Sequence, residues 1–454
     1  MHRERNIRRP GRDSGGEGWP EWPLSIAILS IHSNPFGKLG TQDAGGMNVY
    51  IRELSHELSR QGHRIDIYTR IEGQRGTHEI VHDEGIRLIH VSTGHGGHVP
   101  KNRLYEHLPE VFRGMENLLV NNGRRYHLIH SNYWLSGQLG EWVSRSLGAP
   151  HITMFHTTGL AKNIRCSEEH EPALRSITEK KIAHRADRIL ASTGHEKNDL
   201  CRFFGVPREK ISIVPCGVNL ERFRPVPRKE ARRQLGLAQE IPVILFVGRL
   251  APIKGLDRLL AAVACLHHVR GLKLIVAGGD DTDGHTPEKF RNLARRLGAA
   301  GAVTFAGRVD HDELSVYYSA ADVLALPSYY ESFGLVALEA LACGTPVVAA
   351  PVGAVESIIK QGETGIVVSH PSPRTFGRAL EEILRQAREG AISAEVVRAS
   401  VLHHGWGGVA AATCRMYMKS LCDRSSLHEC DAGPDRSDSC PAAVPMQYCE
   451  RTGT

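Results

Sequence analysis

The feature that most constrains the fold is an alternation of short β-branched runs with longer helical stretches, which occurs twice along the 454-residue chain. Strands separated by helices are typical of parallel sheets. The first series predicts strands at 24–32, 63–70, 86–93, 126–133, 151–157, 186–193 and 211–218. The second predicts strands at 241–249, 272–279, 302–308, 322–328, 345–351 and 364–369. The sequence therefore predicts two doubly wound α/β domains in tandem, with ligands at the carboxyl ends of the strands.

The segments outside these two series set the expected domain boundaries. A polar, proline-bearing stretch separates the series, an arginine-rich stretch precedes them, and an aperiodic stretch rich in Asp, Ser, Pro and Cys ends the chain. We expect a disordered basic arm (1–23), a first domain (24–220), a linker (221–240), a second domain (241–405), a helix that crosses back onto the first domain (406–422) and a disordered tail (423–454).

Composition narrows the class of protein. The net charge is +6, which suits small anionic substrates, and no basic stripe with interleaved aromatics indicates nucleic acid. The ten cysteines form no CxxC pair, so we expect a reducing, cytoplasmic setting with no disulfide and no metal. The longest apolar stretch, 335–355, contains a glutamate and a Gly-Thr-Pro break, so we expect no transmembrane segment. Homo-oligomer formation stays open.

Two glycines, Gly45 and Gly46, stand between the first predicted strand and an amphipathic helix in the segment GTQDAGGMNVYIRELSHEL. A helix N-terminus offers free N–H groups and a partial positive charge, so an anion could approach the backbone closely there. A tight strand-to-helix turn without a ligand explains the glycines equally well.

Two cations follow a predicted strand of the second domain. VGRLAPIKG places Arg249 and Lys254 on one strand-to-helix loop, which suits a phosphate or diphosphate. The alternative is that both side chains are solvated.

Farther on, ESFGLVALEA holds Glu331, just before a helix expected to start at about Phe333, and Glu339 within an apolar helix. A carboxylate there needs donors, which ligand hydroxyls or an internal Arg could supply.

The first domain offers its own polar residues beyond strand ends. His156 and Tyr133 each follow a predicted strand, and Lys101 and Arg175 could bring charge to the same edge. A structural role for His156 and solvation of Lys101 and Arg175 are the plain alternatives.

Five segments in this order, DAGGMNVY, HSNYWLSG, FHTTGLAKN, VGRLAPIKG and ESFGLVALEA, resemble the retaining, nucleotide-sugar-dependent glycosyltransferases of family four, which have the GT-B fold. The resemblance runs from about Leu24 to Leu421. Within the family, the motifs look most similar to the mycothiol-pathway inositol-phosphate N-acetylglucosaminyltransferases and to sucrose-phosphate-synthase-like enzymes. The segment around Arg175, KNIRCSEEHEPALRSITEKK, differs from the mycothiol enzymes.

The resemblance implies a role for each candidate residue. Gly45 and Gly46 would approach the diphosphate of a UDP-sugar donor, Arg249 and Lys254 would hold it, and His156 would lie beside the reacting carbon. Glu331 would contact sugar hydroxyls and Glu339 the ribose. The same resemblance adds to the donor site Asn48, Phe333, Gly334 and Leu335. It assigns the phosphate of the acceptor to Lys101, Tyr133, Thr157 and Arg175.

The expected catalytic residues are His156, Arg249, Lys254 and Glu331. Arg249 and Lys254 would stabilise the leaving diphosphate, so we expect no metal and no cofactor besides the sugar nucleotide. Two alternatives stay open: a GT-B nucleotide-sugar 2-epimerase, which needs no acceptor, and a sugar-nucleotide-binding protein without catalysis. The ESFGLVALE segment argues against the first, and the intact set of charged residues argues against the second.

Overall fold

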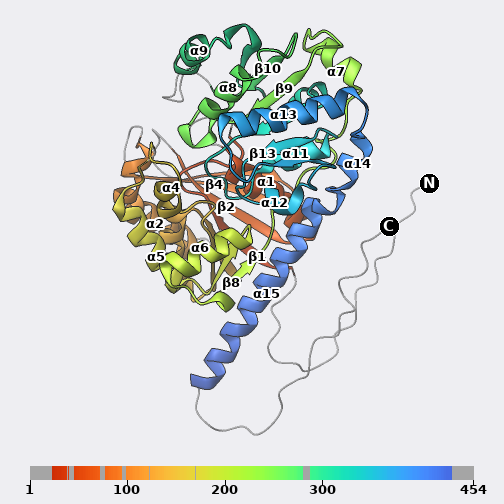
Figure 1. Cartoon of the computed structure of the whole chain (residues 1–454). Coiled ribbons are helices and arrows are strands. Elements are labelled where there is room, and N and C mark those ends of the chain that lie inside the picture. Colours follow the sequence, from red (N-terminus) through yellow and green to blue (C-terminus); the bar gives the residue numbers. More distant parts are fainter. Residues whose placement is uncertain are drawn as a thin grey trace, which may run out of the picture.

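The computed structural model describes residues 23–37, 39, 45–71, 77–94, 99–121, 123–168, 170–279 and 287–431. The expected basic arm, apart from Pro23, lies outside these residues, and so does the expected tail from 432 onward. The chain forms two lobes, each built on a sheet with helices on both faces (Figure 1). This is the expected α/β architecture.

The first lobe contains an eight-stranded sheet in the order β3-β4-β2-β1-β5-β6-β7-β8. Its strands are β1 (Ser25–Leu29), β2 (Arg64–Ile71), β3 (Thr77–Asp83), β4 (Ile86–Ser92), β5 (Leu128–Asn132), β6 (His151–Met154), β7 (Arg188–Ala191) and β8 (Ile211–Ile213). All neighbours pair in parallel except β3 and β4. The sequence pattern does not predict β3, because this edge strand carries exposed residues on both faces and lacks the buried run of the others.

The second lobe contains a six-stranded parallel sheet in the order β11-β10-β9-β12-β13-β14. Its strands are β9 (Val243–Val247), β10 (Lys273–Ala277), β11 (Val303–Gly307), β12 (Val323–Leu326), β13 (Val347–Ala349) and β14 (Gly365–Val367). The chain order reverses around β9 here and around β1 in the first sheet. Loops that leave such a reversal diverge to opposite faces, and they open a crevice at the carboxyl ends of the strands.

Helices cover both sheets. In the first lobe they are α1 (Gly46–Arg60), α2 (Leu108–Asn121), α3 (Trp134–Leu147), α4 (Gly159–Arg165), α5 (Ala173–Arg185) and α6 (Gly194–Phe204). In the second they are α7 (Arg228–Gln234), α8 (Leu256–Ala264), α9 (Pro287–Arg296), α10 (Leu314–Ala320), α11 (Leu335–Ala342), α12 (Val355–Ile358), α13 (Pro373–Arg388) and α14 (Ala394–Ala399). The described residues also contain five short 3-10 turns: η1 (Lys101–His107), η2 (Arg208–Lys210), η3 (Pro252–Lys254), η4 (Ala300–Ala302) and η5 (Leu402–His404).

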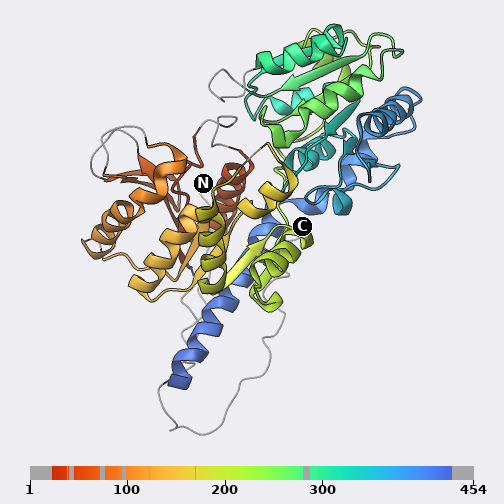
Figure 2. The same ribbon diagram turned by 60° about the vertical axis from the view of Figure 1, so that its left-hand side comes forward.

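Alternate residues of the central strands face different cores, as parallel strands covered on both faces require. In β1, Ile26 and Ile28 belong to a core that continues into the second lobe, while Ala27 and Leu29 belong to a core confined to the first. The shared core holds the two lobes against each other, and Figure 2 shows them side by side.

The stretch expected to be a linker, 221–240, contains helix α7. Arg232 of α7 is buried, and its NH2 lies 2.9 Å from an Asp322 carboxylate oxygen just before β12. A charged residue of α7 therefore forms an internal ion pair, and α7 packs as part of the second lobe.

The last described helix, α15 (Trp406–Asp431), runs along the first lobe (Figure 1). It packs against α1, and the hydroxyl of Tyr417 lies 2.7 Å from Nδ1 of His130 in β5. Near its end, Arg188 donates to Asp423 at 2.8 Å. The expected tail from 423 is therefore helical as far as Asp431.

Candidate functional site

A cavity of about 260 Å³ lies where the two lobes meet, at the carboxyl ends of both sheets. Loops from both lobes line it. The expected site residues in its wall are Gly45, Gly46, Lys101, Tyr133, His156, Thr157, Arg175, Arg249, Lys254, Glu331, Phe333, Gly334 and Leu335. An adjoining cavity of about 200 Å³ includes Arg249, Lys254, Arg308, His311 and Glu339.

The N-terminus of α1 faces the second lobe. Gly45 is its N-cap with no side-chain capping bond, and Gly46 is its first residue. A Cβ atom on Gly46 would lie 3.3 Å from Cδ1 of Leu335 at the start of α11, so a larger residue would crowd the other lobe. The glycine thus permits close approach of the lobes, and it leaves the helix N-terminus open to the cavity.

Asn48 takes a different position from the one expected. It is fully buried, and its Nδ2 donates to Oγ of Ser33 and to the carbonyl oxygen of Asn34, both at 2.8 Å. Its side chain therefore braces the loop after β1, and the structure does not bring it into the wall of either cavity.

Lys254 and Glu331 form an ion pair in the second lobe. Nζ of Lys254 lies 2.7 and 2.9 Å from the two carboxylate oxygens of Glu331, and Ser328 donates to the same carboxylate at 2.8 Å. Only 23% of the Lys254 side chain and 11% of the Glu331 side chain are exposed. The alternative that Lys254 is a solvated surface cation is therefore wrong.

Helix α11 carries the second expected glutamate. The helix begins at Leu335, two residues later than expected, because Gly334 adopts a left-handed conformation (φ 99°) as its N-cap. Glu339 is buried, and Tyr318 donates to it at 2.7 Å, while Nε2 of His311 lies 3.1 Å from its other oxygen. The alternative of an Arg partner for Glu339 is wrong, since a tyrosine and a histidine take that place.

His311 also reaches the first lobe. An NH2 group of Arg52 in α1 lies 3.2 Å from its Nδ1. Arginine can only donate, so Nδ1 accepts and Nε2–H donates to Glu339. The carboxylate expected to bind ribose is thereby connected to a helix of the other lobe.

His156 and Tyr133 have strained backbones. Among the described residues, they are the only non-glycine residues with positive φ, at 58° and 76°. Nε2 of His156 lies 2.8 Å from Oδ1 of Asn132. Burial, followed by the charge of His130, lowers the pKa of His156 to about 3, so this imidazole is neutral at physiological pH. Strain of this kind gathers at functional sites.

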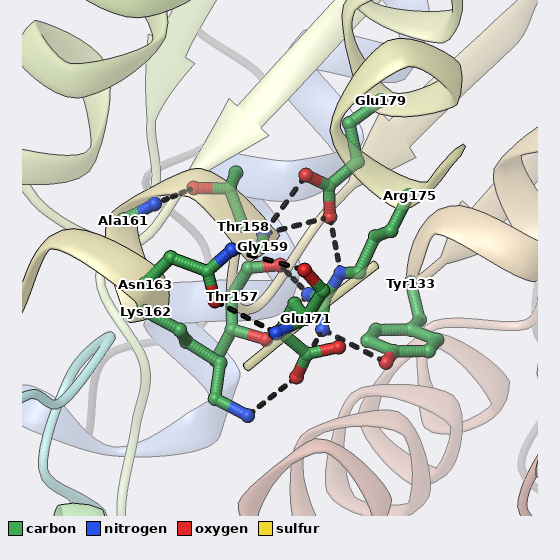
Figure 3. A network of polar contacts seen from close by, with 10 residues as sticks. All are labelled: Tyr133, Thr157, Thr158, Gly159, Ala161, Lys162, Asn163, Glu171, Arg175 and Glu179. Carbon is green, nitrogen blue, oxygen red and sulfur yellow. Dashed lines mark hydrogen bonds and ion pairs between the residues drawn. The ribbon is translucent and has the colours of Figure 1, made fainter. Parts of the chain in front are cut away.

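Arg175 is the centre of a buried polar network in the first lobe (Figure 3). Its Nε donates to Glu179 at 2.7 Å, and its NH1 donates to the Tyr133 hydroxyl at 3.0 Å. Its NH2 donates to the carbonyl oxygen and the hydroxyl of Thr157, at 2.6 and 3.0 Å. The alternative of a solvated Arg175 is wrong, because only 1% of its side chain is exposed.

Lys101 completes this cluster. Its Nζ lies 4.9 Å from the centre of the Tyr133 ring, and the guanidinium carbon of Arg175 lies 4.7 Å from the same centre. The structure thus brings together all four residues expected to hold an acceptor phosphate. His32, which was not among the expected site residues, joins the cluster, and its ring centre lies 4.2 Å from that of Tyr133.

The signal for His32 was its place at the carboxyl end of the first predicted strand, three residues beyond the end of β1. Burial, then the charge of Lys101, holds its pKa well below the usual range, so it adds no positive charge. Lys162 and Glu171 also line the cavity and were not predicted. In the sequence, charged residues of a cavity loop look the same as charged residues of a solvent-exposed turn.

The described residues contain neither a cluster of metal ligands nor a helix that could span a membrane. No group of three or more His, Cys, Asp or Glu side chains there is arranged to hold a metal ion. In the same part of the chain, no helix combines the length and the apolar character needed to cross a bilayer.

Two family models match the chain. The model described as Glycosyltransferase Family 4 covers residues 44–222, and the model described as Glycosyl transferases group 1 covers residues 227–394. The division between them falls just before α7, which agrees with the packing of that helix on the second lobe.

Similar proteins of known name include D-inositol 3-phosphate glycosyltransferase 2 of Catenulispora acidiphila, which is 38% identical over 89% of this chain and 97% of its own length. D-inositol 3-phosphate glycosyltransferase of Kineococcus radiotolerans is 37% identical over 89% of this chain and 98% of its own. A solved structure of sucrose-phosphate synthase from Thermosynechococcus elongatus superposes with a TM-score of 0.80 at 32% identity, over 88% of this chain and 100% of that one.

The expected resemblance and the GT-B fold are confirmed by these matches. They favour sugar transfer over a 2-epimerase and over a binding protein without catalysis. The chain belongs to the glycosyltransferases that join a family 4 domain to a group 1 domain, and it is a hexosyltransferase that uses a nucleotide sugar.

Proposed function

We propose that this enzyme transfers a hexosyl group from a UDP-sugar to a hydroxyl of a phosphorylated polyol or sugar, with inositol phosphate as the leading acceptor, and that it retains the anomeric configuration. The observation that carries the proposal is that one cavity holds a cationic wall from each lobe. One wall suits a diphosphate and the other a phosphate monoester.

The donor side is formed by the second lobe and the N-terminus of α1. Arg249 and Lys254 face the open end of α1, so a diphosphate between them would meet two cations and a helix dipole. Glu339 lies in the adjoining cavity, where its carboxylate can accept from ribose hydroxyls. Glu331 would exchange its contact with Lys254 for sugar hydroxyls when the diphosphate takes over that lysine.

The chemistry follows from this placement. Negative charge develops on the diphosphate as the glycosidic bond breaks, and Arg249 and Lys254 stabilise it without requiring a metal or another cofactor. The acceptor hydroxyl attacks from the face that the diphosphate leaves, and a phosphate oxygen takes its proton. Because His156 is neutral and its Nε2–H donates to Oδ1 of Asn132, it can offer Nδ1 as an acceptor or shape the cavity, but it carries no charge to the reacting carbon.

The acceptor side is formed by the first lobe. Lys101, Arg175, Tyr133 and Thr157 supply two cations and two hydroxyls around one position, which suits a phosphate monoester. The names of the similar inositol-phosphate transferases support the same class of acceptor.

The test is a product assay with a panel of nucleotide sugars, each offered with inositol, inositol 3-phosphate, glucose and glucose 6-phosphate. We expect a UDP-sugar to be consumed only with a phosphorylated acceptor, and NMR of the product to show the donor's anomeric configuration. Consumption of the donor without any acceptor, or an inverted product, contradicts the proposal.

A further inference from the structure

The guanidinium of Arg175 has a polar partner at each of its three nitrogens. It carries five N–H groups. Nε contacts Glu179, NH2 contacts Thr157 twice, and NH1 contacts both the Tyr133 hydroxyl and a Glu171 carboxylate oxygen, the last at 2.9 Å. These four hydrogen bonds and one ion pair occupy all three nitrogens (Figure 3). A phosphate can therefore bind Arg175 only by replacing one of its present partners.

Glu171 is the partner that can be replaced. Glu179 is fully buried and also accepts from the backbone N–H of Gly159 at 2.9 Å, so it is held from two sides. Thr157 accepts partly through its backbone, which cannot turn away. Glu171 lies in the loop before α5, lines the cavity and keeps 19% of its side chain exposed.

The Glu171 carboxylate also occupies a cationic position within the cavity. The same oxygen, Oε1, lies 2.9 Å from NH1 of Arg175 and 2.6 Å from Nζ of Lys162. Burial opposes ionisation there, but the charges of Arg175 and Lys162 lower the pKa of Glu171 to about 2. The carboxylate is therefore an anion at any pH at which the enzyme would be assayed.

We propose that Glu171 is an internal competitor for the acceptor's phosphate and thereby sets acceptor specificity. This inference rests on the proposed function, because it presumes that a phosphate binds at Arg175. A phosphate monoester carries close to two negative charges at neutral pH and can displace a carboxylate with one. A neutral acceptor leaves Glu171 in place and gains nothing from Arg175 or Lys162.

The opposite role is physically reasonable and gives the opposite result. If Glu171 served to hold Arg175 and Lys162 in place for the acceptor, its removal would weaken phosphate binding. If it competes, its removal strengthens binding. The direction of the change therefore decides between the two roles.

The experiment measures the inhibition constant of inorganic phosphate against the acceptor, together with the acceptor KM, in the full-length enzyme. The variants are Glu171→Gln, which removes the charge at nearly the same size, and Glu171→Asp, which keeps the charge but shortens its reach. The matched control is Glu168→Gln, because Glu168 lies three residues away, is 63% exposed and pairs only loosely with Lys289 at 3.8 Å. Urea unfolding midpoints identify any variant that fails to fold.

We expect the phosphate inhibition constant and the acceptor KM to fall about tenfold in Glu171→Gln and to a smaller extent in Glu171→Asp, while Glu168→Gln matches the wild type. Unchanged or raised constants in both Glu171 variants would overturn the inference. If phosphate inhibits the wild type competitively but the variants show no gain, only this inference fails. If phosphate inhibits no form of the enzyme, the acceptor part of the proposed function fails with it.

Discussion

Lys254 and Glu331 contact each other through both carboxylate oxygens, at 2.7 and 2.9 Å, although one is expected to hold the donor's diphosphate and the other its sugar. They come from the loops after β9 and β12, the two strands that flank the reversal of the second sheet. The pair therefore fixes both side chains at the crevice where such folds bind ligands.

Replacing Lys254 should slow the reaction while the enzyme stays folded. A charge-assisted contact to a phosphate contributes roughly 1.5–3 kcal/mol, so Lys254→Ala should cut turnover on the order of ten- to a hundredfold or more. Steady-state rates, with circular dichroism for folding, check this. Arg249→Ala is the companion variant, and near-wild-type rates in both would place the donor elsewhere. A chelator should leave the wild-type rate largely unchanged.

Arg175 is predicted to matter for stability as well as for binding. Removing it leaves the fully buried Glu179 without its cation, which costs about 3–5 kcal/mol of unfolding free energy. Arg175→Met should show this loss in urea unfolding. A second change, Glu179→Gln, should recover part of it, because it removes the unpaired charge. No recovery would mean that the pair is not the source of the loss.

Because Arg175 is buried and paired with Glu179, it is a poor residue with which to probe the acceptor site. A loss of activity in an Arg175 variant mixes folding with binding. Lys101→Ala and Tyr133→Phe are cleaner probes, since Lys101 is only partly buried and the phenylalanine keeps the ring that Lys101 and Arg175 contact.

Glu196 should make stability depend on pH. It accepts from the backbone and hydroxyl of Ser192 at 2.7 and 2.8 Å, and that hydroxyl also lies 3.0 Å from the Ser332 carbonyl of the other lobe. Burial raises the pKa of Glu196 to about 7. Between pH 4.5, the pKa of Glu196 in the unfolded chain, and about pH 7, its pKa in the folded protein, the folded state binds more protons than the unfolded state. The free energy of unfolding therefore falls as the pH rises through this range.

The measurement is urea unfolding of the wild type and Glu196→Gln at pH 5, 6, 7 and 8. Buried histidines with lowered pKa values contribute a slope of the opposite sign, but they are common to both proteins. The difference between the two proteins should therefore change by up to about 3 kcal/mol across this range, in the direction that penalises the wild type at high pH. Parallel curves would contradict the assignment.

Helix α15 should be required for a stable first lobe. It buries Val409, Ala410, Cys414 and Tyr417 in the core that both lobes share. A chain that ends at Gly405 exposes that core and should lose most of its thermal stability, whereas a chain that ends at Asp431 should melt like the full-length protein. Equal melting temperatures for all three chains would show that the helix contributes little.

The sequence predicted most of this architecture because buried parallel strands are continuous apolar runs. It failed at β3 and α7 for related reasons: β3 is an edge strand whose residues are mostly exposed, and α7 is a polar helix whose Arg232 pairs with Asp322, far away in the chain. Local pattern carries no information about such a partner.

The candidate site was predictable where a residue directly follows a strand, as His156, Tyr133 and Arg249 do. The partners of these residues were not. Nothing in the sequence indicates that Glu171 would meet both Arg175 and Lys162, or that His311 would connect Glu339 to Arg52, because those contacts depend on how loops fold back across the sheets.

The most direct test of the account is a comparison of inositol 3-phosphate with inositol as acceptors for a UDP-sugar, in the wild type and in Lys101→Ala. We predict that the wild type prefers the phosphorylated acceptor by at least about a hundredfold in kcat/KM, since two cations face the phosphate, and that Lys101→Ala narrows this preference about tenfold or more. Equal use of both acceptors by the wild type, or an unchanged preference in Lys101→Ala, would contradict the account.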